Sequence, residues 1–124
     1  MKKILIVGAV GQIGSELTME LRRIYGNDNV IASTRKTKPS EIVANSGPFE
    51  YFDILNKQAM AEVCKKYQVD CIINMAAILS AVGEQNPLMA WDINMNGLIN
   101  VLELAREMKM EKVLCPSSDR KSVV

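Results

Sequence analysis

Short apolar runs alternate along this chain with longer segments in which apolar residues recur every three or four positions. The first run, Lys3 to Val7, is mostly apolar and ends at a glycine, which predicts a strand buried on both faces. Between Gln12 and Tyr25, Ile13, Leu17 and Leu21 recur every four residues with charged positions elsewhere. This spacing predicts an amphipathic helix directly after the strand.

The same alternation continues to residue 116. Strands are predicted at Asn29–Ser33, at Glu50–Phe52, from Cys71 onward and at Lys112–Pro116; helices are predicted at Asn56–Tyr67 and from Pro87 onward. The last helix carries an apolar stripe: Trp91, Met95, Leu98, Leu102 and Ala105. Residues 34–48 contain two prolines and a glycine and are predicted as a polar loop.

Strands that alternate with helices are typical of an α/β fold with helices on both faces of a parallel sheet. Right-handed crossovers then favour a doubly wound sheet of strand order 3-2-1-4-5. Ligands of such folds bind beyond the carboxyl ends of the strands, where the strand order reverses. Residues 8–14 and 76–83 are the two loops that face this crevice.

Composition narrows the functional classes. The 124 residues are 48% apolar and 23% charged, as expected of one globular domain. A formal net charge of +1 excludes the basic field that nucleic-acid binding needs. The chain has no apolar stretch of roughly 20 residues and no signal peptide, so neither a membrane span nor secretion is expected and the predicted location is cytoplasmic. With no histidine and no Cys-x-x-Cys spacing, no metal site is expected.

The segment "IVGAVGQIGSE" carries three glycines at intervals of three, Gly8, Gly11 and Gly14. Gly8 permits a tight turn after the strand, Gly11 lets a phosphate approach the backbone, and Gly14 lets the helix pack against the strand. The N-terminus of that helix offers free N–H groups and a positive dipole end. This context predicts dinucleotide binding, and no Gly-Lys-Ser/Thr sequence follows that would indicate a nucleoside triphosphate loop.

The Gly-x-x-Gly-x-x-Gly spacing resembles the extended short-chain dehydrogenase/reductase family, which includes sugar-nucleotide epimerases and dehydratases. The resemblance continues in order through "FDI" at 52–54, "NMAAILS" at 74–80, "NMNG" at 94–97 and "PSS" at 116–118. Within the family, residues 79–106 most resemble the bacterial-type L-threonine 3-dehydrogenases. The resemblance implies a Rossmann-like NAD(P)-binding domain over residues 1–118, followed by a divergent tail at 119–124.

The resemblance also implies which residues contact the cofactor. These are Gly8, Gly11, Gln12, Ile13, Thr34, Arg35, Asp53, Ile54, Ala76, Ala77 and Asn94. Asp53 matches the family aspartate at the adenine amino group, although an aspartate here could equally cap the following helix. The alanines could equally serve packing, and Asn94 shares its helix with other asparagines.

Position 34 departs from the family pattern. An acidic residue about 20 positions after the last glycine normally binds the adenosine ribose of NAD. Here Thr34 is followed by Arg35 and Lys36, two cations that would favour the 2′-phosphate of NADP. The family default remains NAD, with NADP as an alternative, and the cations could also simply begin a solvated loop.

The resemblance implies hydride transfer assisted by a tyrosine, a lysine four residues later and a serine or threonine. Ser118 matches the serine, and Ser80 lies in the stretch that lines the substrate side in similar enzymes. No tyrosine of this chain is followed four residues later by lysine. We therefore expect a reading frame truncated before the sixth strand, the catalytic pair and the substrate domain, inactive alone.

Two other interpretations stay open. One is a non-catalytic dinucleotide-binding module that forms a homo-oligomer or pairs with a complementing chain. The other is a fragment of a sugar-nucleotide epimerase.

Overall fold

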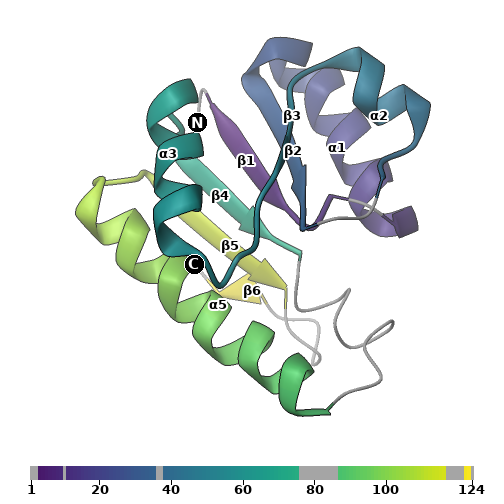
Figure 1. Ribbon diagram of the computed structural model, residues 1–124. Helices are drawn as coiled ribbons and strands as arrows, with labels where there is room; N and C mark the ends of the chain where they lie inside the picture. Colours follow the sequence, from purple (N-terminus) through teal and green to yellow (C-terminus); the bar gives the residue numbers. More distant parts are fainter. Residues whose placement is uncertain (1–2, 10, 36–37, 76–86, 117–121, 124) are drawn as a thin grey trace.

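The structure, a computed structural model, describes residues 3–9, 11–35, 38–75, 87–116 and 122–123. In chain order the elements are β1 (Ile4–Val7), α1 (Gly11–Tyr25), the 3-10 helix η1 (Asn27–Asn29), β2 (Val30–Thr34), α2 (Glu41–Ser46), β3 (Phe49–Tyr51), α3 (Lys57–Tyr67), β4 (Cys71–Asn74), α5 (Pro87–Glu107), β5 (Lys112–Pro116) and β6 (Ser122–Val123). Figure 1 shows their arrangement. Among the described residues, no helix is long and apolar enough to span a membrane.

The strands form one sheet of order β3-β2-β1-β4-β5-β6, in which the first five strands in chain order are parallel. β1 lies at the centre, with Ile4 beside Val30 of β2 and Cys71 of β4. The predicted α/β fold with order 3-2-1-4-5 is therefore confirmed. All four residues of β1 are buried, as the continuous apolar run predicted.

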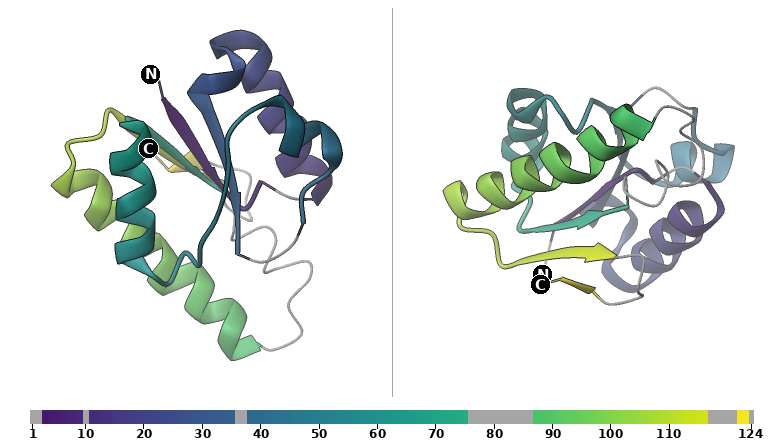
Figure 2. Two further views of the ribbon diagram at one scale, coloured as in Figure 1. Left: turned by 45° about the horizontal axis from the view of Figure 1, so that its top comes forward. Right: turned by 90° about the horizontal axis from the view of Figure 1, so that it is seen from below.

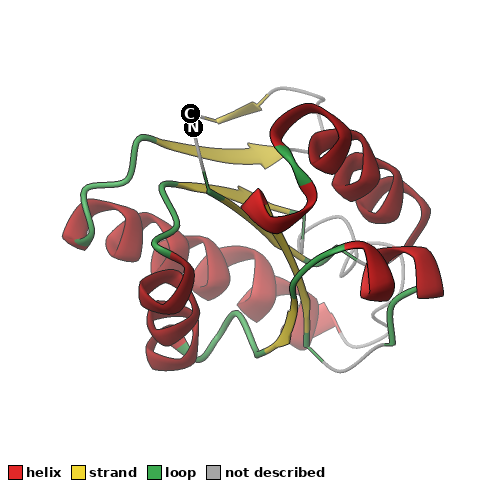
Figure 3. Cartoon of the chain, turned by 90° about the horizontal axis from the view of Figure 1, so that it is seen from above, coloured by secondary structure: helices red, strands yellow, loops and turns green. Residues whose placement is uncertain are grey.

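Two helical layers cover the sheet, with α1 and α2 on one face and α3 and α5 on the other (Figures 2 and 3). Alternate residues of each strand enter the two cores, as the period of two in a strand requires. Leu5 and Val7 pack in the core that α3 and α5 cover, whereas Ile4 and Ile6 pack in the core beneath α1.

The buried face of α1 differs from the predicted stripe. Ile13 is 57% exposed, whereas Gly14, Thr18 and Arg22 are buried. The reason is the close approach of the helix at Gly14, where an added Cβ would lie 2.8 Å from the Gly8 carbonyl oxygen. This contact turns the face with the smallest residue toward the sheet.

The same effect rotates α5 relative to its predicted stripe. Met95 and Leu102 are 43% and 44% exposed, whereas Val101 and Leu104 are buried. Gly97 is buried against Ile54, so the helix approaches the turn after β3 through its glycine. The predicted stripe is therefore wrong at Met95 and Leu102, and the side chain of Trp91 lies outside the described set.

The predicted loop 34–48 contains the helix α2, which the sequence pattern missed. Val43 of α2 is buried, and the Arg22 guanidinium binds the Val43 carbonyl at 2.7 Å and the Ser46 hydroxyl at 2.8 Å. These tertiary contacts stabilise a helix of six residues that its local sequence does not signal.

The carboxyl-terminal residues also differ from expectation. The sequence predicted a truncation before any sixth strand. In the structure, β6 pairs with β5 in an antiparallel register, Cys115 with Val123 and Pro116 with Ser122. β6 is two residues long, so it covers only the end of β5.

Candidate dinucleotide-binding site

The turn after β1 is fixed to the end of β2 by hydrogen bonds. The backbone N–H groups of Gly8 and Ala9 both donate to the Ser33 carbonyl, at 3.0 and 2.8 Å. Gly8 has φ of +79°, a conformation that favours glycine. The Ser33 hydroxyl in turn donates to the Ile6 carbonyl at 2.8 Å. Sequence reasoning missed Ser33, whose only signal was a polar residue within an apolar strand.

Helix α1 begins directly over this turn. A Cβ at Gly14 would lie 2.8 Å from both the Gly8 oxygen and the Ala9 carbonyl carbon. The first backbone N–H groups of the helix, at Gly11, Gln12 and Ile13, have no acceptor one turn earlier within it. A tight turn under an open helix N-terminus fits the pyrophosphate of a dinucleotide, because both N–H groups and the helix dipole favour an anion.

The end of β2 lies beside this turn and carries no carboxylate. Thr34 is 5% exposed, and its carbonyl accepts a hydrogen bond from the Phe52 N–H at 3.0 Å. Arg35, the next residue, is exposed. The position that the sequence assigned to the adenosine ribose is thus a buried threonine followed by an exposed cation.

A turn after β3 brings Asp53 to the same edge of the sheet. Asp53 Oδ1 accepts from the Leu55 N–H at 2.9 Å, and the Asp53 carbonyl accepts from the Asn56 N–H at 2.8 Å. Asn56 caps α3, since its side chain accepts from the Ala59 N–H at 3.1 Å. The alternative that Asp53 caps this helix is therefore wrong, and its carboxylate belongs to the turn.

Seven predicted site residues lie along one sheet edge, at the carboxyl ends of β1, β2 and β3: Gly8, Gly11, Ile13, Thr34, Arg35, Asp53 and Ile54. Ala76, Ala77, Ser80 and Ser118 lie outside the described residues. Gln12 lies in α1 and Asn94 in α5, but the positions of their side chains are not described.

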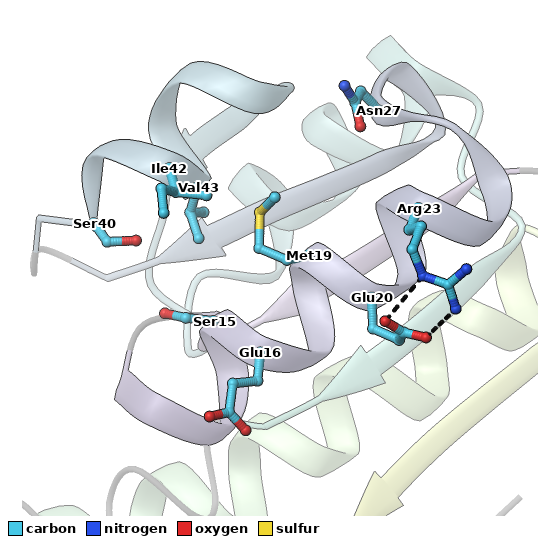
Figure 4. Close-up of a pocket in the computed structure, with 9 residues that line it drawn as sticks. All are labelled: Ser15, Glu16, Met19, Glu20, Arg23, Asn27, Ser40, Ile42 and Val43. Carbon is cyan, nitrogen blue, oxygen red and sulfur yellow. Dashed lines mark hydrogen bonds and ion pairs between the residues drawn. The ribbon is translucent and has the colours of Figure 1, made fainter.

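A separate hollow lies between α1 and α2 (Figure 4). Met19, Ile42 and Val43 form its apolar part, and Glu20 pairs with Arg23 at its rim. This hydrogen-bonded pair lowers the pKa of the Glu20 carboxyl. None of the predicted site residues that the structure describes lines the hollow, so it is distinct from the edge of the sheet at the carboxyl ends of β1, β2 and β3.

The described residues offer little other chemistry. No group of three His, Cys, Asp or Glu side chains that could hold a metal occurs among them. Cys64 and Cys71 are buried free thiols, and burial raises their pKa to about 12 and about 11. Such thiols stay protonated at neutral pH and are poor nucleophiles.

Comparison with known proteins agrees with this geometry. The profile of the NAD dependent epimerase/dehydratase family matches residues 4–121. An epimerase/dehydratase of Staphylococcus haemolyticus is 47% identical over 118 residues, which are 95% of this chain and 37% of the relative. The chain thus spans just over a third of that relative's length.

Two solved structures are similar to the chain. The L-threonine dehydrogenase of Clostridium difficile is 57% identical with a TM-score of 0.86, over 95% of this chain and 37% of that one. A GalE-like L-threonine dehydrogenase of Cupriavidus necator is 41% identical with a TM-score of 0.79, over 90% and 36% of the two chains. With its glycine turn, its sheet order and this match over nearly its whole length, the chain belongs to the NAD dependent epimerase/dehydratase family.

Proposed function

We propose that this chain is the NAD(P)-binding part of an oxidoreductase similar to L-threonine 3-dehydrogenase. The observation that carries the proposal is the turn at Gly8 and Ala9, held on Ser33 beneath the start of α1. The 57% identity to an L-threonine dehydrogenase supports the choice of substrate class within the family.

Residues at the carboxyl ends of β1, β2 and β3 contact different parts of the dinucleotide. The N–H groups at the start of α1 hold the pyrophosphate, Thr34 and Arg35 face the adenosine ribose, and Asp53 accepts from the adenine amino group. A bound nicotinamide would supply the hydride acceptor for oxidation of the carbon that bears the substrate hydroxyl. In L-threonine this oxidation would yield 2-amino-3-oxobutanoate.

We propose that these 124 residues alone do not turn over substrate. The sequence has no Tyr-x-x-x-Lys pair to remove the hydroxyl proton, and acid–base catalysis of this kind is commonly worth about 10²–10⁴-fold. We propose that the chain binds dinucleotide and that a complementing chain or segment supplies the acid–base pair. A non-catalytic binding module and part of a sugar-nucleotide epimerase are the competing functions.

Titration with NADH and NADPH, followed by nucleotide fluorescence, tests the binding. We expect saturable binding of at least one nucleotide. An assay with L-threonine and NAD tests the second part, where the expected result is no turnover above the blank. Clear turnover of threonine would overturn the claim that the chain needs a complementing group, while leaving the binding site in place.

NADP is the second candidate cofactor, because of residues at the end of β2. Thr34 replaces the carboxylate that would repel a 2′-phosphate, and Arg35 adds an exposed cation beside it. The substitution Thr34→Asp should lower NADPH affinity by about tenfold and leave or raise NADH affinity, since like charges are brought together.

Isothermal titration of Thr34→Asp against both nucleotides checks this prediction. Ser40→Asp, at an exposed position before α2, is the control and should leave both affinities nearly unchanged. An unchanged ratio of NADPH to NADH affinity in Thr34→Asp would contradict the assignment of position 34 to the ribose.

A further inference from the structure

Helix α5 holds the turn after β3 through a hydrogen bond between residues far apart in sequence. Asn100 Nδ2 donates to the Ile54 carbonyl at 3.0 Å and is partly buried. Sequence reasoning assigned Asn100 no role, because an asparagine on a helix carries no signal about its partner. The contact links α5 to the residue that directly follows Asp53.

Gly97 makes a second contact with the same residue. A Cβ at Gly97 would lie 3.0 Å from Ile54 Cγ2 and 3.1 Å from Cδ1, so the helix backbone approaches the Ile54 side chain closely. Gly97 and Asn100 are three positions apart and therefore share one face of α5. Ile54 is thus fixed at both its carbonyl and its side chain, and it is 5% exposed.

These contacts determine where the Asp53 carboxylate lies. Its Oδ1 is bound by the Leu55 N–H, so the carboxylate moves with the turn. The turn is joined to β2 on one side, through Phe52 and Thr34, and to α5 on the other, through Ile54. A change in the α5 contact would therefore shift Asp53 relative to the glycine turn.

We propose that Asn100 is a positioning residue for adenine recognition, which holds the Asp53–Ile54 turn so that the carboxylate meets the adenine 6-amino group. This inference rests on the proposed function, since it presupposes a dinucleotide at the sheet edge. An amide suits the role because it donates to a carbonyl without burying a charge. Leucine at position 100 would fill a similar volume but leave the Ile54 carbonyl without this donor.

The test compares NADH with reduced nicotinamide hypoxanthine dinucleotide, in which an oxygen replaces the 6-amino group. Facing an acceptor instead of a donor, a correctly placed carboxylate disfavours the hypoxanthine analogue. We expect the unmodified chain to prefer NADH by about tenfold and Asp53→Asn to lose most of that preference. Asn100→Leu should reduce the preference to about two- to threefold.

Leu102→Asn, at an exposed position on α5, is the control and should keep the full preference. In an Asp53→Asn background, Asn100→Leu should produce little further change in the ratio of the two affinities, because it acts through Asp53. A purely structural role for Asn100 would weaken both nucleotides equally and leave this ratio unchanged, and that result would overturn the inference.

Gly97→Ala provides a second test if Asn100→Leu does not fold. The added methyl group would displace the Ile54 side chain, so the preference for NADH over the hypoxanthine analogue should again fall. An unchanged preference in this variant would overturn the inference, as would a lack of preference in the unmodified chain. Failure of the unmodified chain to bind either NADH or NADPH would overturn the proposed function as well, so the two failures are distinguishable.

Discussion

At the scale of single residues, Gly14 sets the distance between α1 and the turn that precedes it. Gly14→Ala would bring a methyl carbon within 2.8 Å of the Gly8 oxygen, and backbone atoms cannot move aside as a flexible side chain does. We expect α1 to shift outward, with a loss of about 1–3 kcal/mol of stability and at least tenfold weaker nucleotide binding.

Urea unfolding and NADH titration of Gly14→Ala check this. Glu16→Ala, at an exposed position of the same helix, is the control and should leave both quantities nearly unchanged. Normal NADH affinity in Gly14→Ala would show that the turn does not hold the nucleotide.

The buried thiols make stability depend on pH in the alkaline range. Burial raises the pKa of Cys64 to about 12 and that of Cys71 to about 11, above the roughly 8.5 of an exposed thiol. The thiols of the unfolded chain ionise first as the pH rises. The stability that the buried, protonated thiols contribute is therefore complete below pH of about 8.5 and is lost as the pH rises toward the folded-state pKa values of about 11 and about 12.

Urea unfolding at pH 7.5, 9 and 10 should show a falling free energy of unfolding. Cys71→Ala should fall less steeply over the same range, because one of the two thiols is gone. Parallel pH dependences for the two proteins would contradict the burial of Cys71.

At the scale of elements, α2 depends on one side chain from α1. Arg22 is 1% exposed, and its guanidinium donates to the carbonyls of Val30, Val43 and Pro48 and to the Ser46 hydroxyl. All four acceptors are neutral, so burial lowers the pKa of this guanidinium. Arg22→Met would retain the apolar stem but remove these four hydrogen bonds, and the Pro48 carbonyl would keep the Ala32 N–H as a donor.

We expect Arg22→Met to lower the free energy of unfolding by about 2–4 kcal/mol, since each buried hydrogen bond that is lost costs roughly 1 kcal/mol. Urea unfolding at pH 7 measures this. Arg23→Met, which removes an exposed ion pair with Glu20, should change stability little. Equal effects of the two substitutions would show that α2 does not depend on Arg22.

Strands were more predictable than helix faces. β1 and β4 follow from apolar runs because a strand buried on both faces has one possible pattern. The faces of α1 and α5 did not follow, since glycines rather than the largest apolar residues make close contacts, Gly14 with the turn after β1 and Gly97 with Ile54. Nor did α2, whose helix is stabilised by Arg22 from a distant segment.

In the candidate site, too, local features were predictable and contacts between distant residues were not. The glycine turn was predictable because its residues are close in sequence and each glycine has a local reason. The roles of Ser33 and Asn100 were not, because each depends on a partner 27 or 46 positions away. The sequence allowed Asp53 to cap α3, a position that Asn56 takes in the structure.

At the scale of the whole molecule, the parallel sheet brings three separate segments to one edge. β1, β2 and β3 are neighbours in the order β3-β2-β1, so the residues that follow each strand lie side by side. Two cores, one on each face of the sheet, hold this edge in place. Binding of a dinucleotide across the edge would therefore stabilise the whole fold by mass action.

The central claim, that this edge binds a nicotinamide dinucleotide, is tested most directly by isothermal titration of the purified chain with NADH and, separately, NADPH. The account predicts saturable one-to-one binding of at least one of them, which Gly14→Ala weakens at least tenfold. Absence of saturable binding of either nucleotide to a folded chain would contradict it.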